Sequence, residues 1–285
     1  GPVPIRLGSG IGMEVTSKAP INPTENGTAT FPATIVGWES ATTPDYSTAT
    51  TWQNILTVKA STNEQAVTWT DGTEYYNSNE AIETYMLAWH PEGSLSGSTV
   101  TFTNGNDGSK DAMITQVVNR NKNTGNTDIP TLNFEHKSAQ VIFKVKTDEE
   151  EYTGGEITPL TSITIKNVKT VTGFDLSTSP FSAIYSTSPT NVNVPVTSNL
   201  TIKNEVQDAG EGVMIAPEGN SITLDVVAGN VTYPDQVVKL IENGNIEEGK
   251  SYIVTLTFTR QGIQVQATVK AWEPGNGSGT DIDLI

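Results

Sequence analysis

VTLTFTRQGIQVQATVKA, residues 254–271, alternates apolar and polar side chains on both sides of a short turn. Before the turn, Val254, Leu256 and Phe258 alternate with threonines, and after it apolar residues recur at every second position from 263 to 271. A period of two places successive side chains on opposite faces of a β-strand. The stretch therefore predicts an antiparallel hairpin with one buried face, turning at its Arg-Gln-Gly step.

Shorter runs of the same kind cover much of the remaining chain, and turn residues separate them. They lie at 54–60, 66–70, 99–103, 141–146, 162–168, 213–216 and 221–227. One short helix is expected at 79–89, and no other stretch sustains a 3.6-residue apolar repeat. Many short strands with Gly, Asn, Asp and Pro between them are typical of antiparallel β-sandwiches. The sequence therefore predicts an all-β protein.

Residues 119–131, NRNKNTGNTDIPT, are almost wholly polar and contain Gly and Pro, which is typical of a linker. The chain has 285 residues with 35% hydrophobic content, enough for two β domains that each bury a core. We therefore expect two tandem β-sandwich domains, residues 1–128 and 129–285.

Just beyond this boundary the apolar alternation changes its parity. Leu132, Phe134 and His136 share one face, whereas apolar residues at 139–145 continue on the opposite parity. A strand that switches faces must bend or bulge, so we expect an interruption near Lys137 and Ser138.

Composition excludes several classes of function. Asp and Glu number 32 against 16 Lys and Arg, and the formal net charge is -16. Such a surface repels phosphate backbones, and no basic, aromatic groove interrupts it, so nucleic acid is not an expected partner. With no cysteine, disulfides and thiolate chemistry are excluded. No apolar run of about 18 residues and no leader is present. The chain is therefore expected to be either cytosolic or an exported protein already stripped of its signal, and loops rich in Thr, Ser, Asn and Gly favour the second.

Residues that could carry chemistry are few in kind. The two histidines, His90 and His136, lie at the end of an apolar run and at the expected bend, where structural roles are predicted. A lone histidine without cysteine completes neither a zinc site nor a Ser-His-Asp triad. The loop at 104–111 misplaces the first ligands of a calcium-binding loop. Carboxylates are so abundant that chance pairs keep a glycoside hydrolase as a third hypothesis. We predict no catalytic residues, no metal and no cofactor.

Both ends of the chain carry strand patterns. Near the N-terminus, apolar residues alternate at 3, 5 and 7, and after Gly8-Ser9-Gly10 the alternation resumes with Ile11, Met13 and Val15. This pattern predicts a strand with its apolar face buried in the first domain.

At the other end, Ile282 and Leu284 alternate with aspartates behind a Gly-rich stretch at 275–279. An amphipathic strand on a flexible linker can be offered to another molecule. An edge strand packed on its own domain, or a frayed terminus, explains the same pattern, and the two interpretations stay open.

Three segments carry a combined pattern. The stretch LNFEHKSAQVIFKV at 132–145 contains F-x-H-x-x-A-x-[LIV]-x-F, and GKSYIVTLTF at 249–258 leads into a last strand that ends in Ala271 and Trp272. Residues 85–91 form an apolar run that ends in Pro. In this order and at this spacing the segments resemble the fimbrillin-like family of Bacteroides-type bacteria, which includes pilus subunits and surface lipoproteins.

This resemblance implies two tandem transthyretin-like β-sandwich domains in a protein exported as a lipoprotein to the cell surface, outer membrane or fimbrium. It implies a structural, tip or accessory pilin that supports adhesion and whose partners are other pilin subunits. Assembly would proceed by strand exchange: a protease removes an N-terminal strand, and a neighbour's strand fills the groove.

The implied site residues follow from this mechanism. Lys18 and Ala19 stand where the family often has Arg followed by Ala, and are the expected processing site. Ile11, Met13 and Val15 would belong to the displaced strand. Ile282 and Leu284 would belong to a donor strand.

A different class of function is also compatible with the sequence. The chain could be a surface adhesin or carbohydrate-binding module that is not built into a polymer. Its first half contains six aromatic residues that could stack on sugars if they were exposed: Trp38, Trp52, Trp69, Trp89, Tyr75 and Tyr76. Filling of the protein core is the alternative and favoured role for them. A host glycan or host protein would then be the partner. Contact with a membrane is expected only through a lipid anchor on the precursor.

Overall fold

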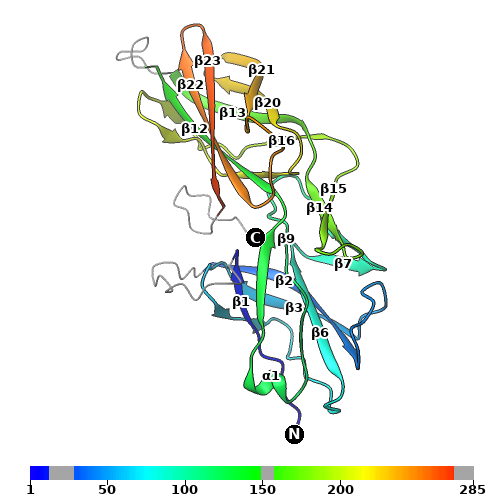
Figure 1. Ribbon diagram of the computed structural model, residues 1–285. Helices are drawn as coiled ribbons and strands as arrows, with labels where there is room; N and C mark the ends of the chain where they lie inside the picture. Colours follow the sequence, from blue (N-terminus) through cyan, green and yellow to red (C-terminus); the bar gives the residue numbers. More distant parts are fainter. Residues whose placement is uncertain (13–28, 149–156, 273–285) are drawn as a thin grey trace.

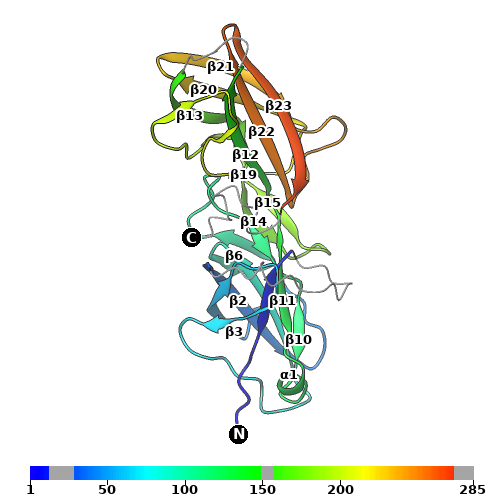
Figure 2. The same cartoon turned by 90° about the vertical axis from the view of Figure 1, so that its left-hand side faces the viewer.

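The computed structural model describes residues 1–12, 29–148 and 157–272 of the chain. It is nearly all-β and elongated, with two bodies stacked end to end (Figures 1 and 2). The lower body, which contains the N-terminus, comprises β1–β11, α1, β14 and β15, and the upper body comprises β12, β13 and β16–β23. The all-β prediction is confirmed, whereas a transthyretin-like character of two tandem domains stays a prediction.

The lower body is built mainly from the first half of the chain. Its elements are β1 (Gly8–Ile11), β2 (Thr30–Ser40), β3 (Trp52–Lys59), β4 (Gln65–Ala66), β5 (Thr68–Trp69), β6 (Glu83–His90), β7 (Gly93–Ser96), β8 (Thr99–Phe102), β9 (Met113–Ile114), β10 (Val118–Arg120), α1 (Thr124–Thr127), β11 (Thr131–His136), β14 (Val171–Asp175) and β15 (Ser182–Tyr185).

The large sheet of the lower body closes on itself. Its strands follow the order β4-β1-β11-β9-β6-β2-β3-β5, with β10 also paired to β6. Only Val67 separates β4 from β5, so the two ends of this order meet in one short stretch of chain. The sheet therefore curls into a barrel. Its interior holds Ile5, Leu7, Ile11, Phe31, Ala33, Ile35, Leu56, Val58, Tyr76, Met86, Ala88, Met113, Leu132, Phe134, Met214 and Trp272.

Strand β6 corrects one sequence prediction, the helix at 79–89. Met86 and Ala88 point into the barrel, whereas Tyr85, Leu87 and Trp89 join a second core on its outside. A strand buried on both faces reads as a continuous apolar run, which periodicity alone does not separate from a buried helix.

The second core lies between the barrel and a four-stranded sheet of order β15-β14-β8-β7. Strands β7 and β8 come from the first half of the chain, and β14 and β15 come from the second half (Figure 1). At their seam, Gly173 of β14 pairs with Thr101, and a Cβ at this position would overlap the Val100 carbonyl oxygen. Glycine therefore permits the close approach of the two halves.

The upper body is a sandwich of two five-stranded sheets around one core. One has the order β18-β12-β22-β23 with β19 on β12, and the other has β16-β13-β20-β21 with β17 on β13. The bounds are β12 (Ala139–Thr147), β13 (Ile157–Val168), β16 (Thr190–Asn193), β17 (Leu200–Ile202), β18 (Gln207–Asp208), β19 (Val213–Ile215), β20 (Ser221–Ala228), β21 (Val231–Lys239), β22 (Lys250–Thr259) and β23 (Gly262–Ala271).

Two predictions from apolar alternation are confirmed. Strands β22 and β23 form the expected hairpin, pairing 250–259 with 262–271. The expected interruption near Lys137 and Ser138 separates β11 from β12, and the chain passes there from the lower to the upper body.

The division of the chain at residues 128 and 129 stays a prediction about independent folding units. In the structure, β11 lies just after that position and pairs with β1 and β9 of the barrel. Strands β14 and β15 also extend the lower body, so segments from beyond residue 128 complete it.

Candidate functional site

The N-terminal segment, residues 3–12, lies between β11 and the stretch 61–76 and hydrogen-bonds to both (Figures 1 and 2). Strand β1 runs parallel to β11 and antiparallel to β4. The backbone N–H groups of Gly8 and Gly12 donate to the carbonyls of Pro130 and Phe134, at 3.0 and 2.8 Å. The segment is thus an internal strand of the barrel, supplied by the first residues of the chain.

The opposite edge of the segment is bonded equally well. The N–H of Ile5 donates to Glu74 O at 2.9 Å, that of Ile11 to Ser61 O at 2.9 Å, and that of Val67 to Leu7 O at 3.0 Å. Because these donors and acceptors belong to the backbone, any extended strand in the same register could satisfy them.

Alternate side chains of the segment point into the barrel. Ile5, Leu7 and Ile11 are almost fully buried, and Ile11 lies in register with Phe134 of β11. Full burial of such a side chain contributes about 1.5–3 kcal/mol, so the three together contribute several kcal/mol to holding the segment. Loss of the segment would expose the same apolar core to water.

Ser9 interrupts this apolar series. It has the parity of Leu7 and Ile11 and lies in register with buried Leu132, yet it carries a hydroxyl. Ser9 is fully buried, and its Oγ has no hydrogen-bond partner among the residues that the structure describes. A polar group occupies a core position here.

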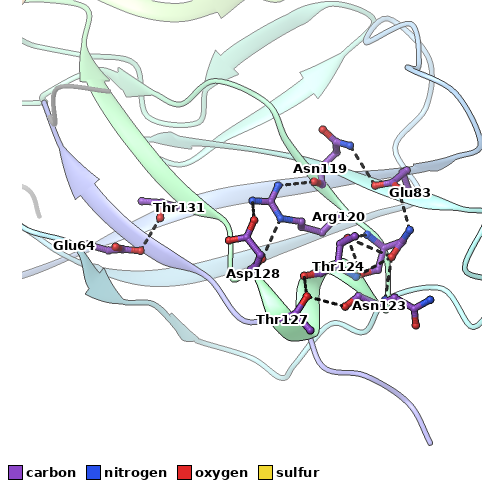
Figure 3. Close-up of polar contacts among 10 residues, drawn as sticks. Glu64, Glu83, Asn119, Arg120, Asn123, Thr124, Thr127, Asp128 and Thr131 are labelled. Carbon is purple, nitrogen blue, oxygen red and sulfur yellow. Dashed lines mark hydrogen bonds and ion pairs between the residues drawn. The ribbon is translucent and has the colours of Figure 1, made fainter. Parts of the chain in front are cut away.

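A side-chain hydrogen bond crosses over β1 at Gly8. Thr131 on β11 donates through Oγ1 to Oε1 of Glu64 at 2.6 Å, and Gly8 pairs with Thr131 on one side and Ala66 on the other (Figure 3). A Cβ at Gly8 would overlap Glu64 Oε1. We call the Glu64–Thr131 hydrogen bond the clasp, because it closes over β1 only while residue 8 has no side chain.

An open cavity of about 580 Å³ lies along this segment. Its walls include Ile5, Leu7 and Gly8 from the segment, and Glu64 and Trp69 from the opposite side. The Trp69 Nε1–H donates to the Ile5 carbonyl at 2.9 Å, which ties the segment to this wall.

Polar contacts fix the turn that leads into β11 (Figure 3). Arg120 pairs with Asp128 at 2.9 Å and also donates to the Asp128 carbonyl at 3.0 Å. Asn121 donates to Glu83 at 3.1 Å. Below the turn, Tyr76 packs where Gly125 leaves room for its ring, and burial raises the pKa of Tyr76 to about 12. This framework sets the position at which β11 begins beside β1.

Both histidines are packed within the lower body. His90 Nδ1 lies 2.6 Å from the Pro32 carbonyl, so Nδ1 carries the proton that is donated. Burial lowers the pKa of His90 below its ordinary value, opposed in part by that hydrogen bond. Its neighbours give it a structural role.

His136 occupies the junction between the bodies. Its Nδ1 lies 2.9 Å from the Asp111 carboxylate, and its ring stacks on Trp272 with centroids 3.8 Å apart. Trp272 follows the last upper strand, yet it packs in the barrel core of the lower body. Sequence analysis did not pair Asp111 with His136, because nothing local relates a loop aspartate to the end of a distant strand.

The next features concern possible metal sites, the loop around Asp107 and membrane-spanning helices in the described parts of the chain. Those residues contain no group of three or more His, Cys, Asp or Glu placed to hold a metal ion. Asp107 accepts hydrogen bonds from the Ser109 hydroxyl and, at 3.0 Å, from the Ser109 N–H, and both lower the pKa of Asp107. No helix among the described residues is long and apolar enough to span a membrane.

The tryptophans considered for sugar stacking contribute to the packing of the lower body. Trp38 and Trp89 are buried, and the rings of Trp52 and Trp69 contact each other edge to face at 6.0 Å. Tyr75 is the one aromatic residue among the exposed large apolar side chains that the structure describes.

The structure describes only part of the predicted site. Ile11 lies in β1 and is fully buried. The remaining predicted site residues lie outside the described residues: Met13, Val15, Lys18, Ala19, Ile282 and Leu284. Four further residues of the site were not predicted from the sequence: Gly8, Ser9, Glu64 and Thr131. The break in the odd-numbered alternation at Ser9 is a signal that could have indicated the first two.

Solved structures share this fold. A cell-adhesion candidate from Bacteroides uniformis superposes with a TM-score of 0.66 at 16% identity, covering 95% of this chain and 98% of the other. A fimbrial protein from Bacteroides vulgatus gives a TM-score of 0.52 at 14% identity over 94% and 99%. At these identities the likeness concerns the fold.

Sequence comparison defines the family. A candidate fimbrium subunit from Bacteroides uniformis, Fim1C, is 25% identical over 146 residues, which are 51% of this chain and 46% of that protein. The chain thus matches about half the length of this relative. A model of the fimbrillin-like family matches residues 24–272. The chain belongs to the fimbrillin-like family, a class of surface fimbrial proteins.

Proposed function

We propose that this protein is a structural, tip or accessory subunit of a bacterial surface fimbria that assembles by β-strand exchange and supports adhesion. One observation carries the proposal: the first residues of the chain form an internal barrel strand, bonded on both edges and buried on its apolar face. Removal of this strand would leave unpaired backbone groups beside an apolar groove, which is a template for a strand from another subunit.

Processing is proposed to occur between Lys18 and Ala19, which follow β1 in sequence. The displaced strand would include Ile11, and by their parity also Met13 and Val15. The donor strand is proposed to carry Ile282 and Leu284 on its apolar face, two residues apart.

Limited trypsin digestion tests the exchange. The product cut after Lys18 is identified by N-terminal sequencing, freed of residues 1–18 in mild urea, and sized by light scattering. We expect it to assemble, or to take up a labelled peptide of residues 1–12, and the Lys18→Gln variant serves as the uncut control. A product that stays monomeric and takes up no strand peptide contradicts the proposal.

The donor strand is tested with the double variant Ile282→Asp, Leu284→Asp. Charges at apolar donor positions should abolish assembly of the cut protein while leaving its uptake of the 1–12 peptide unchanged. Assembly at the normal rate would exclude Ile282 and Leu284 as donor residues.

Neither catalysis nor a metal or other cofactor is part of the proposed function. Family membership places the chain among fimbrial proteins. We expect screens for glycosidase, esterase and protease activity to show no turnover, with and without divalent ions. Turnover abolished by a single carboxylate substitution would contradict this.

A further inference from the structure

The strand that fills the groove is a poor match to it at one core position. Along residues 5–11, the barrel-facing positions carry Ile, Leu, Ser and Ile in turn, and the hydroxyl of Ser9 is buried without a partner among the described residues. Leu132 stands beside Ser9 in register. A buried hydroxyl that loses its bonds to water and gains none in return opposes folding of the segment that carries it.

The residues on either side of Ser9 weaken the strand further. Gly8 and Gly10 flank it, and glycine is disfavoured inside strands because it contributes no side-chain packing and loses the most chain entropy on folding. The middle of β1 therefore binds the groove more weakly than a strand with an apolar residue in place of Ser9 would. Ile5, Leu7 and Ile11, on either side of it, are buried and bind well.

The clasp imposes a second condition, on the outward-facing position 8. Glu64 and Thr131 come from the two sides of the groove, and their 2.6 Å hydrogen bond passes over the backbone of residue 8 (Figure 3). Any side chain at this position would overlap Glu64 Oε1 and open the clasp. An occupant that keeps the clasp closed must have glycine there.

We propose that the groove selects, from other fimbrial subunits, a donor strand with glycine at the position of Gly8 and a small apolar residue at the position of Ser9. Such a strand keeps the backbone bonds, the apolar contacts and the clasp, and it removes the unpartnered hydroxyl. The donor strand would therefore bind more tightly than β1 and replace it, because β1 carries Ser9 at this position. This inference rests on the strand exchange proposed above and specifies its partner.

A competition experiment with labelled peptides tests the selection. Full-length protein nicked after Lys18 is incubated with peptides of residues 1–12 that carry the native sequence, Ser9→Ala or Gly8→Ala, and binding is followed by fluorescence anisotropy. The Ser9→Ala peptide should bind about tenfold more tightly than the native one, which corresponds to about 1.4 kcal/mol. The Gly8→Ala peptide should bind about threefold more weakly, because the overlap displaces only the end of the exposed Glu64 side chain and breaks one exposed hydrogen bond.

The Glu64→Ala protein is the matched control for the clasp. Without the carboxylate, the Gly8→Ala peptide should bind at least as well as the native one, because alanine is favoured over glycine inside a strand, while the preference for alanine at position 9 should persist. Equal binding of the native and Ser9→Ala peptides, or a Gly8→Ala penalty that survives in Glu64→Ala, would overturn the proposed selection.

A second measurement separates failure of the selection from failure of strand exchange. In the intact chain, Ser9→Ala should slow hydrogen exchange at the Gly8, Ile11 and Gly12 amides about tenfold, because these amides are bonded only while β1 is in place. If no peptide enters the nicked protein, strand exchange fails. If Ser9→Ala leaves these amides unchanged, the role assigned to Ser9 is wrong whatever the peptides do.

Discussion

The first and last described strands of the chain, β1 and β23, are held in opposite ways. All residues of β23 pair with β22, to which a tight turn connects it directly. Strand β1 pairs with β11, which lies far along the chain, and with the short β4. A hairpin strand stays next to its partner even when its bonds open. Strand β1 has no such tether, because both of its neighbours are distant in the chain, and in the proposed exchange it is the strand that another would replace.

The largest expected loss of stability tests whether β1 is held in place by its neighbour β11 and not by the upper body. Phe134→Ala removes the fully buried ring in register with Ile11 and should cost about 3–5 kcal/mol of unfolding free energy in urea. It should also speed hydrogen exchange at Gly12, whose N–H donates to the Phe134 carbonyl.

Phe258→Ala is the matched control in the upper body, since Phe258 is equally buried and lies in register with Ile263 of β23. Its cost should be similar, but β1 amides should keep their protection below the global unfolding transition. Equal release of β1 by both variants would show that the two strands are coupled.

The next effect compares single side chains on the two strands. Ile11→Ala on β1 removes a fully buried side chain and should cost about 2 kcal/mol or more. Ile263→Ala on β23 removes a half-buried one at the edge of the upper core and should cost about half as much. Urea midpoints with unchanged slopes measure both, and a larger cost for Ile263→Ala would reverse the comparison.

A pH effect on stability should come from His90, which is buried in the body that holds β1. Burial lowers the pKa of His90 in the folded state. In the unfolded chain the pKa of a histidine is about 6.5, so just below that pH the unfolded chain binds more protons than the folded one. Stability should therefore fall as pH drops from about 7 towards 5.

The variant His90→Asn keeps a donor for the Pro32 carbonyl but removes the titrating ring. Urea unfolding across this pH range, followed by tryptophan fluorescence, should show a flatter profile for the variant. Identical pH slopes for the two proteins would mean that His90 does not contribute.

The smallest effect concerns the turn that precedes β11. Arg120→Ala removes an ion pair with the exposed Asp128 and should cost about 1 kcal/mol or less. Lys144→Ala, which removes a 3.1 Å pair with Asp208 in the upper body, is the comparison. A loss at Arg120 several times larger than at Lys144 would make this turn a critical support of β1.

Strands that pair with a neighbour in sequence could be predicted from the sequence, whereas pairings between strands far apart in the chain could not. The hairpin β22–β23 was predictable because its partners are adjacent and only one of its faces is buried. Strand β6 was missed because both its faces are buried, which hides the alternation. The seam between β8 and β14 left no local trace, since each strand alone reads as an ordinary short strand.

The candidate site shows the same limit. Alternation gave the buried face of the N-terminal strand and placed Ile11 on it, as the structure confirms. Glu64 and Thr131 could not be assigned, because their contact exists only after the barrel brings 64 and 131 to opposite sides of β1. Alternation predicts the strand, whereas the contact between Glu64 and Thr131 is found only in the folded structure.

The four-stranded sheet that both halves of the chain build has a mechanical consequence. Strands β7 and β8 belong to the first half of the chain, whereas β14 and β15 lie in sequence between β13 and β16, so the chain connects them on both sides to the upper body. A pull that separates the bodies must break the β8–β14 ladder and draw Trp272 out of the barrel core before the connecting segment extends. Under tension we therefore expect little rotation of one body against the other, and the two bodies should bear the load together.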